Sequence, residues 1–312
     1  MNTNSKIYVA GHRGLVGSAL IRALEAHGFS NLVRKTRKEL DLLKQTDVNE
    51  FFNKEKPEYV FLAAAKVGGI MANKTYPAEF IYENITVQTN VINAAYRHGV
   101  KKLLFLGSSC IYPRMAVQPM KEEYLLSGEL EPTNRAYATA KIAGIVTCQA
   151  YSEEYGANFI SVMPTNLYGQ NDNFDLEQSH VLPALIRKFH DAKRGRKKEV
   201  VLWGTGAPLR EFLHVDDLAD ACIFLMEEYN QSEIINVGTG EDISIKALAE
   251  LVKKITVFKG EVSWDSSRPD GMPRKLLDVS KLHSLGWRHS ISLTEGIKRT
   301  YEWYTTNHKH KH

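Results

Sequence analysis

Tyr137 and Lys141 form the residue pair in this sequence whose types and spacing point most directly to chemistry. They stand four residues apart in the segment RAYATAKIAG, which is rich in helix formers, so both side chains should project from one face of a helix. An unperturbed phenol has a pKa of about 10, and a neighbouring ammonium favours its phenolate form. We therefore predict a tyrosine that exchanges a proton with a substrate near neutral pH.

Two serines follow a predicted strand, at a place where their hydroxyls could bind the same substrate oxygen as the tyrosine. Ser108 and Ser109 directly follow Leu103–Leu106, an apolar run typical of a buried strand. Because α/β sheets place ligands at the carboxyl ends of their strands, a serine hydroxyl at this point can hydrogen-bond a substrate carbonyl while Tyr137 protonates its oxygen. A YxxxK pair alone occurs by chance in many helices, so these serines strengthen the interpretation.

Gly11, Gly14 and Gly17 follow the first apolar run, Ile7–Ala10, and open the first expected helix, Val16–His27. Glycines let the backbone turn sharply and approach a pyrophosphate, whose charge then meets the N–H groups of the helix N-terminus. The spacing is GxxGxxG rather than the commoner GxGxxG. A tight strand-to-helix turn is the alternative, but the order of strand, glycines and helix favours nucleotide binding.

The second expected strand, Leu32–Arg34, ends in basic residues. An NAD site holds the free ribose 2′-hydroxyl with Asp or Glu about 20 residues after the glycine loop, whereas this chain has the run Arg34–Lys38 there. Cations suit a 2′-phosphate, and Arg13 in the glycine loop can reach the same place. We therefore predict NADP as the cofactor, with a solvated basic turn as the alternative.

The elements that must position these residues alternate between short apolar runs and segments of helical period. This pattern is typical of a parallel sheet with crossover helices, so the fold class is α/β. Besides the helix over 16–27, which Gly28 should end, we expect one over Ala78–Arg97 after Pro77. The expected strands are Ile7–Ala10, Leu32–Arg34, Tyr59–Ala63, Leu103–Leu106 and Phe159–Val162.

Beyond Pro164 the pattern changes to a polar stretch over 169–179, a helix over 183–192 and mixed short elements. The sequence thus predicts a Rossmann-type doubly wound parallel sheet with a smaller C-terminal α/β substrate domain. The expected division is 1–165 for the NADP-binding domain and 166–312 for the substrate domain. The apolar pattern around 209–240 looks core-like, so we expect this stretch to return to the first domain.

Composition excludes several other classes of protein. With 43% hydrophobic and 24% charged residues, the chain is neither disordered nor fibrous, and a net charge of +4 is too small for a nucleic-acid binder. No apolar run approaches the 18 residues of a membrane span, and the N-terminus lacks a signal peptide. We therefore expect no nucleic acid and no membrane among its partners.

The metal-binding residue types are few and scattered. Cys110, Cys148 and Cys222 are widely spaced with no CxxC pair, so we expect neither disulfides nor zinc, and a cytoplasmic location. The basic loop 194–198 and the tail histidines fit a solvated loop and a frayed terminus better than a nucleic-acid or metal site. These tail histidines are His308, His310 and His312.

The glycine loop, the serine after the fourth strand and the YxxxK pair, in that order, resemble the extended short-chain dehydrogenase/reductases. Ser109-Cys110 lacks the acidic residues that the nucleotide-sugar 4,6-dehydratases have after the serine, which argues against that activity. Five further stretches, spread over nearly the whole chain, are similar to the GDP-L-fucose synthase family. They are Ala63–Ile70, Gly107–Pro113, Met163–Gly169, Arg210–Asp217 and Pro269–Asp278.

The resemblance implies an NADPH-dependent 3,5-epimerase and 4-reductase that acts on GDP-4-keto-6-deoxy-D-mannose. A C4 ketone acidifies the C3 and C5 protons, because either carbanion is stabilised as an enolate. By resemblance Cys110 is the base and His180 the acid, Ser108 and Tyr137 hold the enolate, and Lys141 also holds the nicotinamide ribose. A thiol of pKa about 8.5 and an imidazole near 6.5 can trade protons near neutrality.

Without the resemblance, Cys110 would be interpreted as a small buried apolar residue and His180 as a local hydrogen-bonding group. The resemblance further implies a homodimer built on the helix over Ala78–Arg97 and the helix that carries Tyr137. The implied cofactor contacts are Gly11, His12, Arg13, Gly14, Leu15, Val16, Gly17, Arg37, Ala63, Ala64, Leu106, Gly107, Lys141, Pro164, Asn166, Leu167 and His180. The implied substrate contacts are Ser109, Asn166, Lys188, Trp203, Arg210, Asp270 and Lys275.

Lys188 stands where the family often has arginine, so it supplies charge without the bidentate fork. Two other functions stay open. A nucleotide-sugar 4-epimerase of the same fold would keep NAD bound and use no Cys/His pair, which the basic turn and Cys110 oppose. An NADP-sensing Rossmann protein without chemistry would have no use for the Tyr137/Lys141 pair.

Overall fold

The structure is a computed structural model, and it describes residues 1–176, 178–268 and 270–307. A six-stranded sheet with the order β2-β1-β3-β4-β5-β9 lies at its centre, and every neighbouring pair is parallel. All five strands expected from the apolar runs are present, with ends that differ by at most two residues. The sheet consists of β1 (Ile7–Ala10), β2 (Leu32–Val33), β3 (Tyr59–Leu62), β4 (Lys102–Leu106), β5 (Phe159–Pro164) and β9 (Ile235–Val237).

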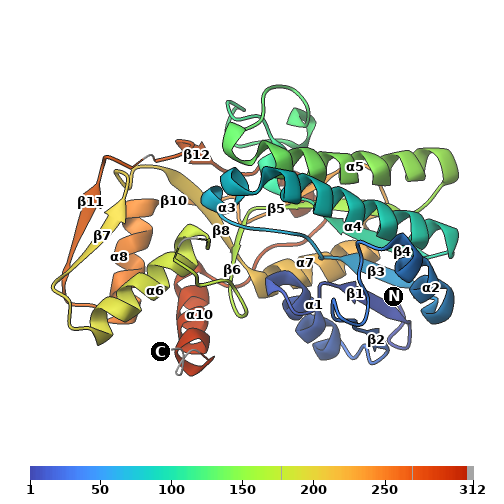
Figure 1. Cartoon of the computed structure of the whole chain (residues 1–312), viewed down its shortest axis with the longest axis horizontal. Coiled ribbons are helices and arrows are strands. Elements are labelled where there is room, and N and C mark those ends of the chain that lie inside the picture. The colour runs from blue at the N-terminus through green and yellow to red at the C-terminus, as the bar shows by residue number, and fades with distance from the viewer. Residues whose placement is uncertain (177, 269, 308–312) are drawn as a thin grey trace.

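Helices cover both faces of this sheet (Figure 1). Alternate residues of β1 enter opposite cores: Ile7 and Val9 face one layer, and Tyr8 and Ala10 face the other. α1 (Leu15–Ala26) and α7 (Val215–Glu228) pack on the first face. The opposite face is covered by α2 (Gln45–Glu55), α4 (Pro77–Arg97) and α5 (Arg135–Tyr155). The predicted doubly wound parallel sheet is therefore confirmed.

The ends of the predicted helices follow from local sequence. α1 ends at Ala26, and Gly28 adopts φ of +82°, the left-handed conformation expected of a glycine just after a helix. α4 begins at Pro77, which needs no N–H partner in the first turn of a helix. The helix expected over 183–192 is longer by two residues at each end and forms α6 (Val181–Arg194).

A smaller second region packs against one side of the central sheet and has its own core (Figure 1). α8 (Ile245–Thr256) and α10 (Leu293–Asn307) share this core with α6. Two small sheets complete the region, one around β8 and one formed by the parallel pair β7 and β11. Their strands are β6 (Asn166–Tyr168), β7 (Glu199–Trp203), β8 (Leu209–His214), β10 (Asp242–Ser244), β11 (Glu261–Asp265) and β12 (Arg274–Lys275).

The chain passes between the two regions more than once. α7 and β9 join the central layers, whereas β8, which lies in the stretch expected to return, pairs with β6, β10 and β12 in the second region. The remaining short elements are α3 (Ile70–Thr75), α9 (Ser280–Ser284) and single 3-10 turns at Ser109–Ile111, Glu122–Tyr124 and Pro132–Asn134.

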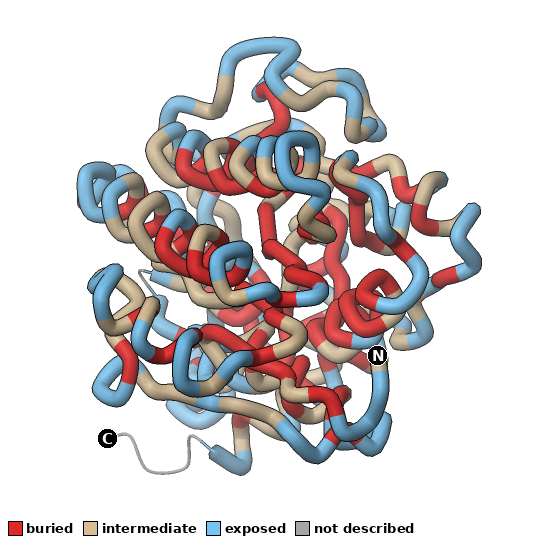
Figure 2. Tube along the Cα trace, turned by 90° about the vertical axis from the view of Figure 1, so that its right-hand side faces the viewer, coloured by how far each residue is buried: buried red, intermediate tan, exposed pale blue. Residues whose placement is uncertain are grey.

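Burial follows this layered arrangement. In Figure 2 the buried residues gather along the inner parts of the trace, and exposed residues occupy the outer turns. None of the described helices combines the length and the apolar character that crossing a bilayer requires. The carboxyl ends of the parallel strands β1, β3, β4 and β5 meet at one edge of the sheet, and the candidate site is built there.

Candidate active site

The glycine loop joins β1 to α1 and leaves the helix N-terminus open. Gly11 adopts φ of +84°, and a Cβ on it would lie 2.8 Å from the Ala64 backbone nitrogen. A Cβ on Gly17 would lie 2.1 Å from the Gly11 carbonyl oxygen, so only glycine permits this approach of α1 to β1. No side chain caps α1 at Gly14. The first N–H groups of the helix therefore suit a pyrophosphate.

The basic turn after β2 is only partly engaged by other protein groups. Arg34 forms an ion pair with Glu25 of α1. Arg37 stands 3.9 Å from Glu83 with 73% of its side chain exposed, and Arg13 is exposed as well. Arg37 and Arg13 are thus accessible to a 2′-phosphate, whereas Arg34 would first have to leave its carboxylate.

Tyr137 and Lys141 lie one turn apart on α5, as their spacing predicts. The Lys141 Nζ donates a hydrogen bond of 2.7 Å to the carbonyl oxygen of Leu106, at the end of β4, and lies 5.8 Å from the centroid of the Tyr137 ring. Ser108 follows β4 two residues later, and its Oγ accepts a hydrogen bond of 3.3 Å from the backbone N–H of Cys110. The carboxyl end of β4 therefore gathers these side chains.

The protonation state of Tyr137 differs from our prediction. Burial raises its pKa, the nearby Cys110 adds to the rise, and the hydrogen bond with Ser108 opposes it. The expectation that Lys141 favours the phenolate is wrong for this site, because its ammonium is bonded to the Leu106 carbonyl and is itself desolvated, which lowers its own pKa to about 8. A neutral phenol is the form that can donate a proton.

Cys110 and His180 also have shifted pKa values. Burial raises the pKa of the Cys110 thiol, against the opposing effects of the Lys275 ammonium, the Ser108 hydrogen bond and Lys141. His180 stands at the N-cap position of α6 and is an exposed residue as a whole, yet desolvation of its imidazole, with the nearby Lys275, lowers its pKa. Lys275 thus acts on both groups, and the ligand-free pair is a neutral thiol and a neutral imidazole.

Arg210 and Lys275 form a pair of cations on neighbouring strands. They are directly opposite each other in the parallel pairing of β8 with β12. Desolvation lowers the pKa of both, and the carboxylate of Asp270 opposes the shift of Arg210. Two half-buried cations side by side repel each other, and a diphosphate would relieve that repulsion.

Trp203 and the cations around it form a platform at the end of β7. The indole is 54% exposed, and the Lys188 Nζ lies 5.5 Å from its centroid. The guanidinium carbon of Arg268 lies 5.1 Å from the same ring. Sequence reasoning missed Arg268, since nothing in its spacing marks it among the basic residues of its loop.

Asp270 is tied to the loop that follows β7. Its carboxylate accepts hydrogen bonds of 2.7 Å from both the backbone N–H and the hydroxyl of Thr205. A Cβ on Gly204 would lie 2.2 Å from the Asp270 Oδ1. The carboxylate therefore orders residues 204–206 next to Trp203, in addition to any contact with a base.

The other expected contacts lie at the same edge of the central sheet. Asn166 donates a hydrogen bond of 2.7 Å from its amide to the carbonyl oxygen of Glu211, and Ser109 is 3% exposed in the turn after β4. The His12 Nδ1 is buried without a hydrogen-bond partner among the described residues, as a group that awaits a ligand would be. The remaining cofactor contacts that the resemblance implies are Leu15 and Val16 in α1, Ala63 and Ala64 after β3, Gly107 after β4, Pro164 in β5 and Leu167 in β6.

Glu211 was not expected from the sequence and fixes the strand that carries Lys275. Its fully buried carboxylate accepts hydrogen bonds of 2.7 and 2.8 Å from the N–H groups of Thr239 and Gly240, and one of 3.0 Å from that of Leu277. It thereby joins the end of β9 to the residues after β12. The stretch Arg210–Asp217 carries part of the family resemblance, but the role of this carboxylate follows only from tertiary contacts.

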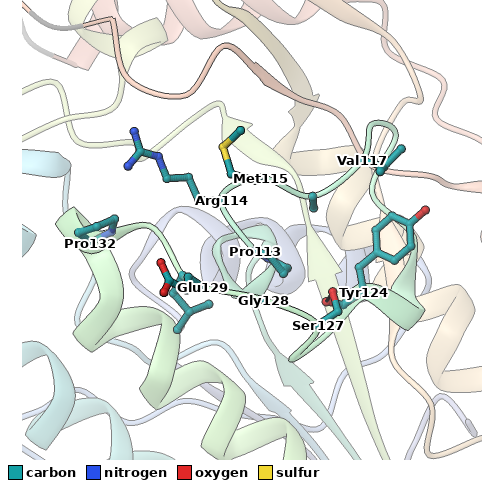
Figure 3. Close-up of a pocket in the computed structure, with 11 residues that line it drawn as sticks. Pro113, Arg114, Met115, Val117, Tyr124, Ser127, Gly128, Glu129 and Pro132 are labelled. Carbon is teal, nitrogen blue, oxygen red and sulfur yellow. Dashed lines mark hydrogen bonds between the residues drawn. The ribbon is translucent and has the colours of Figure 1, made fainter.

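A cavity of about 640 Å³ lies elsewhere, in the excursion between β4 and α5 (Figure 3). Its lining residues fall between Pro113 and Pro132 and include none of the predicted site residues. Among residues 1–176, 178–268 and 270–307 there is no cluster of three or more His, Cys, Asp or Glu suited to a metal ion. The tail histidines His308, His310 and His312 lie outside the described residues.

Comparison with known proteins places these features in context. Residues 7–238 match the sequence model of the NAD dependent epimerase/dehydratase family. A GDP-L-fucose synthase of Arabidopsis thaliana is 63% identical over 97% of this chain and 94% of its own, and that of Escherichia coli K12 is 54% identical over 98% of each. A GDP-mannoheptose C4 reductase of Campylobacter jejuni, solved with NADP bound, is 48% identical, with a TM-score of 0.91 over 98% of this chain and 99% of its own.

Proposed function

The chain belongs to the NAD-dependent epimerase/dehydratase family and, within it, to the GDP-L-fucose synthases, and we propose on this basis that it converts GDP-4-keto-6-deoxy-D-mannose to GDP-L-fucose with NADPH. The conversion combines inversion at C3 and C5 with reduction at C4. The proposal places this reaction in the cytoplasm.

The observation that carries the proposal is the position of Cys110 beside the reductase residues. The thiol is in electrostatic contact with Lys275, Lys141 and Tyr137, and shares the Ser108 hydroxyl with Tyr137. A ketone that Ser108 and Tyr137 bind is therefore within reach of a group that can take a proton from a neighbouring carbon. A plain ketone reductase has no use for such a group.

The glycine loop fits a dinucleotide, because only glycines allow its close backbone approaches and no side chain closes the helix N-terminus. Arg13 and Arg37 are exposed and accessible to a 2′-phosphate. NADPH supplies a hydride for C4 of the sugar when it is bound. Besides its hydrogen bond to the Leu106 carbonyl oxygen, the Lys141 ammonium would hold the nicotinamide ribose next to the ketone.

In the epimerisation the sugar C4 carbonyl accepts hydrogen bonds from Ser108 and Tyr137. Because the resting thiol and imidazole are both neutral, the Cys110 proton first passes to His180. The thiolate then removes a proton from C3 or C5, and the electron pair moves onto the C4 oxygen as an enolate. The imidazolium returns a proton to the opposite face of that carbon, which inverts it and restores a neutral pair.

In the reduction Tyr137 gives its phenolic proton to O4 as C4 gains hydrogen. Burial keeps the phenol neutral, so the proton is present when the oxygen needs it. The diphosphate lies against Arg210 and Lys275, and the nucleoside extends toward Trp203. This assignment places the diphosphate charge against two half-buried cations, whose pKa values Asp270 and Glu211 raise only against a larger desolvation.

We also propose a homodimer formed through α4 and α5. These helices pack side by side in the same layer, and their outer surfaces expose large apolar residues. They are Tyr82 and Tyr96 on α4, and Val146 and Tyr155 on α5. A two-fold contact of this pair would cover them in a four-helix arrangement.

The test separates epimerisation from hydride transfer. Deuterium incorporation at C3 and C5 of the 4-keto sugar in D₂O measures the first, and oxidation of GDP-L-fucose by NADP⁺, which is the reduction run backwards, measures the second. Cys110→Ser is expected to abolish incorporation while the oxidation continues. Cys148→Ala is the matched control, because Cys148 is fully buried in the central core.

Two outcomes would contradict the proposal. Unchanged incorporation in Cys110→Ser would move the base to another residue. A wild-type protein that reduces GDP-linked 4-keto sugars without any incorporation would be a C4 reductase, the activity named for the relative from Campylobacter jejuni. No turnover at all would favour the NADP-sensing alternative.

A further inference from the structure

The loop that leaves β3 contacts the backbone that leads to His180. The Gly69 N–H donates a hydrogen bond of 2.9 Å to the carbonyl oxygen of Gln178. A Cβ on Gly69 would lie 3.0 Å from the Ser179 carbonyl oxygen and 3.1 Å from that of Gln178. Gly69 has φ of −64°, which any residue can adopt, so glycine is required by the space and not by the backbone angle. The two segments meet with no room for a side chain.

Two buried asparagines fix the loop on its other side. Asn84 of α4 accepts a hydrogen bond of 2.9 Å from the Lys66 N–H and donates one of 3.0 Å to the Lys66 carbonyl oxygen. Asn73 of α3 donates hydrogen bonds of 2.8 and 3.1 Å to the carbonyl oxygens of Gly68 and Gly69. The loop is therefore held at both ends, and it cannot yield easily to a clash at Gly69.

His180 depends on its backbone for its position. Among the described residues no hydrogen bond is made by its imidazole, and His180 is an exposed residue at the N-terminus of α6. The backbone before it is fixed by the hydrogen bond of 3.0 Å from the Ser179 N–H to the Asp175 carbonyl oxygen, and by the Gly69 contact. A displacement of residues 178–179 would therefore carry the imidazole with it.

We propose that Gly69 is a positioning residue for His180 and acts through the backbone of Gln178 and Ser179. This inference rests on the proposed function, in which His180 returns the proton during epimerisation. The loop belongs to the cofactor-binding side of the molecule and His180 to the second region. The contact sets the distance between the proton donor and the sugar carbon without touching the substrate.

Gly69→Ala in the full-length protein tests this inference. A misplacement of about 1 Å can cost a catalysed step about 100-fold, so we expect deuterium incorporation at C3 and C5 to fall about 10- to 100-fold. Oxidation of GDP-L-fucose by NADP⁺ does not use His180 as a proton donor and should change less than about threefold. The ratio of the two rates is the readout, because a general loss of folded protein lowers both equally.

Gly68→Ala is the matched control in the same loop. A Cβ there would lie 2.9 Å from the Ala72 Cβ and 3.1 Å from the Phe80 ring, so it strains the loop without pressing on residues 178–179. This variant should keep the wild-type ratio. Asn73→Asp keeps the shape of the side chain but replaces the amide donor with a carboxylate oxygen that faces the Gly68 and Gly69 carbonyl oxygens. We expect it to lower the ratio of incorporation to oxidation, as Gly69→Ala does, by a smaller factor.

A double variant identifies the residue through which Gly69 acts. If the effect passes through His180, then Gly69→Ala should lower incorporation no further in a His180→Asn background. Equal losses of both rates in Gly69→Ala, or an additional loss in the double variant, would overturn the inference. Absence of incorporation in the wild-type protein would instead overturn the proposed function, and the inference with it.

Discussion

The two sets of side chains around the expected sugar differ in how the chain holds them. The reduction group, Ser108, Tyr137 and Lys141, lies just after β4 and on α5, and the Lys141 Nζ donates a hydrogen bond of 2.7 Å to the β4 backbone. The isomerisation group, Cys110, His180 and Lys275, comes from three segments that are far apart in the sequence. Cys110 lies beside Ser108 in the turn after β4, whereas His180 is at a helix N-terminus and Lys275 on a two-residue strand of the second region. One group is built into the central sheet, and the other is assembled by contacts between regions.

The difference shows which part of the chemistry tolerates change. Disturbing the contacts between the two regions should weaken isomerisation and leave reduction largely intact, since the reduction group needs only the central sheet. A relative that has lost the isomerisation group can therefore still reduce a C4 ketone. Four experiments test this difference, and they follow from the largest expected effect to the smallest.

Tyr137→Phe should affect the reduction group alone. The substitution keeps the half-buried ring in edge contact with Phe80 and removes the hydroxyl that protonates O4. Positioned proton transfer contributes about 10²- to 10⁴-fold, so NADPH consumption should fall about 1000-fold. Deuterium incorporation should fall much less, because Ser108 still holds the enolate oxygen. Equal losses of both activities would show that the two groups do not act separately.

Lys275→Met should affect substrate binding and isomerisation together. A hydrogen bond to a charged group is worth about 1.5–3 kcal/mol, so KM for the GDP-sugar should rise about 10- to 100-fold. Because the Lys275 ammonium lowers the pKa of both His180 and Cys110, both limbs of the pH profile of incorporation should move to higher pH in the variant. Steady-state kinetics with both readouts over a pH series measures these effects. A variant with wild-type KM and an unshifted profile would remove Lys275 from both roles.

The pH dependence of incorporation follows from the Cys110 and His180 shifts. The reactive form needs a thiolate and an imidazolium, while burial raises the thiol pKa and desolvation lowers that of the imidazole. The rate should rise up to about tenfold per pH unit below the His180 pKa, stay level between the two pKa values, and fall above the Cys110 pKa. The rate of GDP-L-fucose oxidation should lack the rising and falling limbs that His180 and Cys110 produce. Coincident profiles would assign the titrating groups to the reduction group instead.

Arg37→Ala should produce the smallest effect. Its guanidinium is mostly exposed, and exposed ion pairs contribute about 1 kcal/mol or less, so KM for NADPH should rise up to about fivefold. KM for NADH should not change, because NADH lacks the 2′-phosphate. Arg13→Ala provides a comparison within the glycine loop. A parallel rise for both cofactors would indicate that Arg37 stabilises the loop and does not recognise the phosphate.

Local sequence was sufficient for the elements that carry the reduction group. The five strands are buried on both faces and appear as continuous apolar runs, and Tyr137 and Lys141 are neighbours on one helix. The short strands of the second region could not be predicted in this way. β12 has two residues and is defined only by its pairing with β8, which is distant in the sequence.

The same distinction applies to individual side chains. Arg268, Glu211 and Gly69 owe their roles to contacts with segments far away in the chain, so no local spacing marks them. The pKa of Tyr137 was predicted in the wrong direction for a related reason. The spacing of Lys141 indicated proximity, but burial and the Leu106 carbonyl, which decide the balance, are tertiary features.

The Glu211 carboxylate limits how the molecule can open for so large a ligand. Separating the strand of Lys275 from the end of β9 would break either the Leu277 hydrogen bond or the Thr239 and Gly240 hydrogen bonds of Glu211. A hydrogen bond to a charged group is worth about 1.5–3 kcal/mol. We therefore expect the contact between the residues after β12 and the end of β9 to stay closed during turnover. We expect any movement that admits the sugar nucleotide to separate other contacts between the two regions before this one.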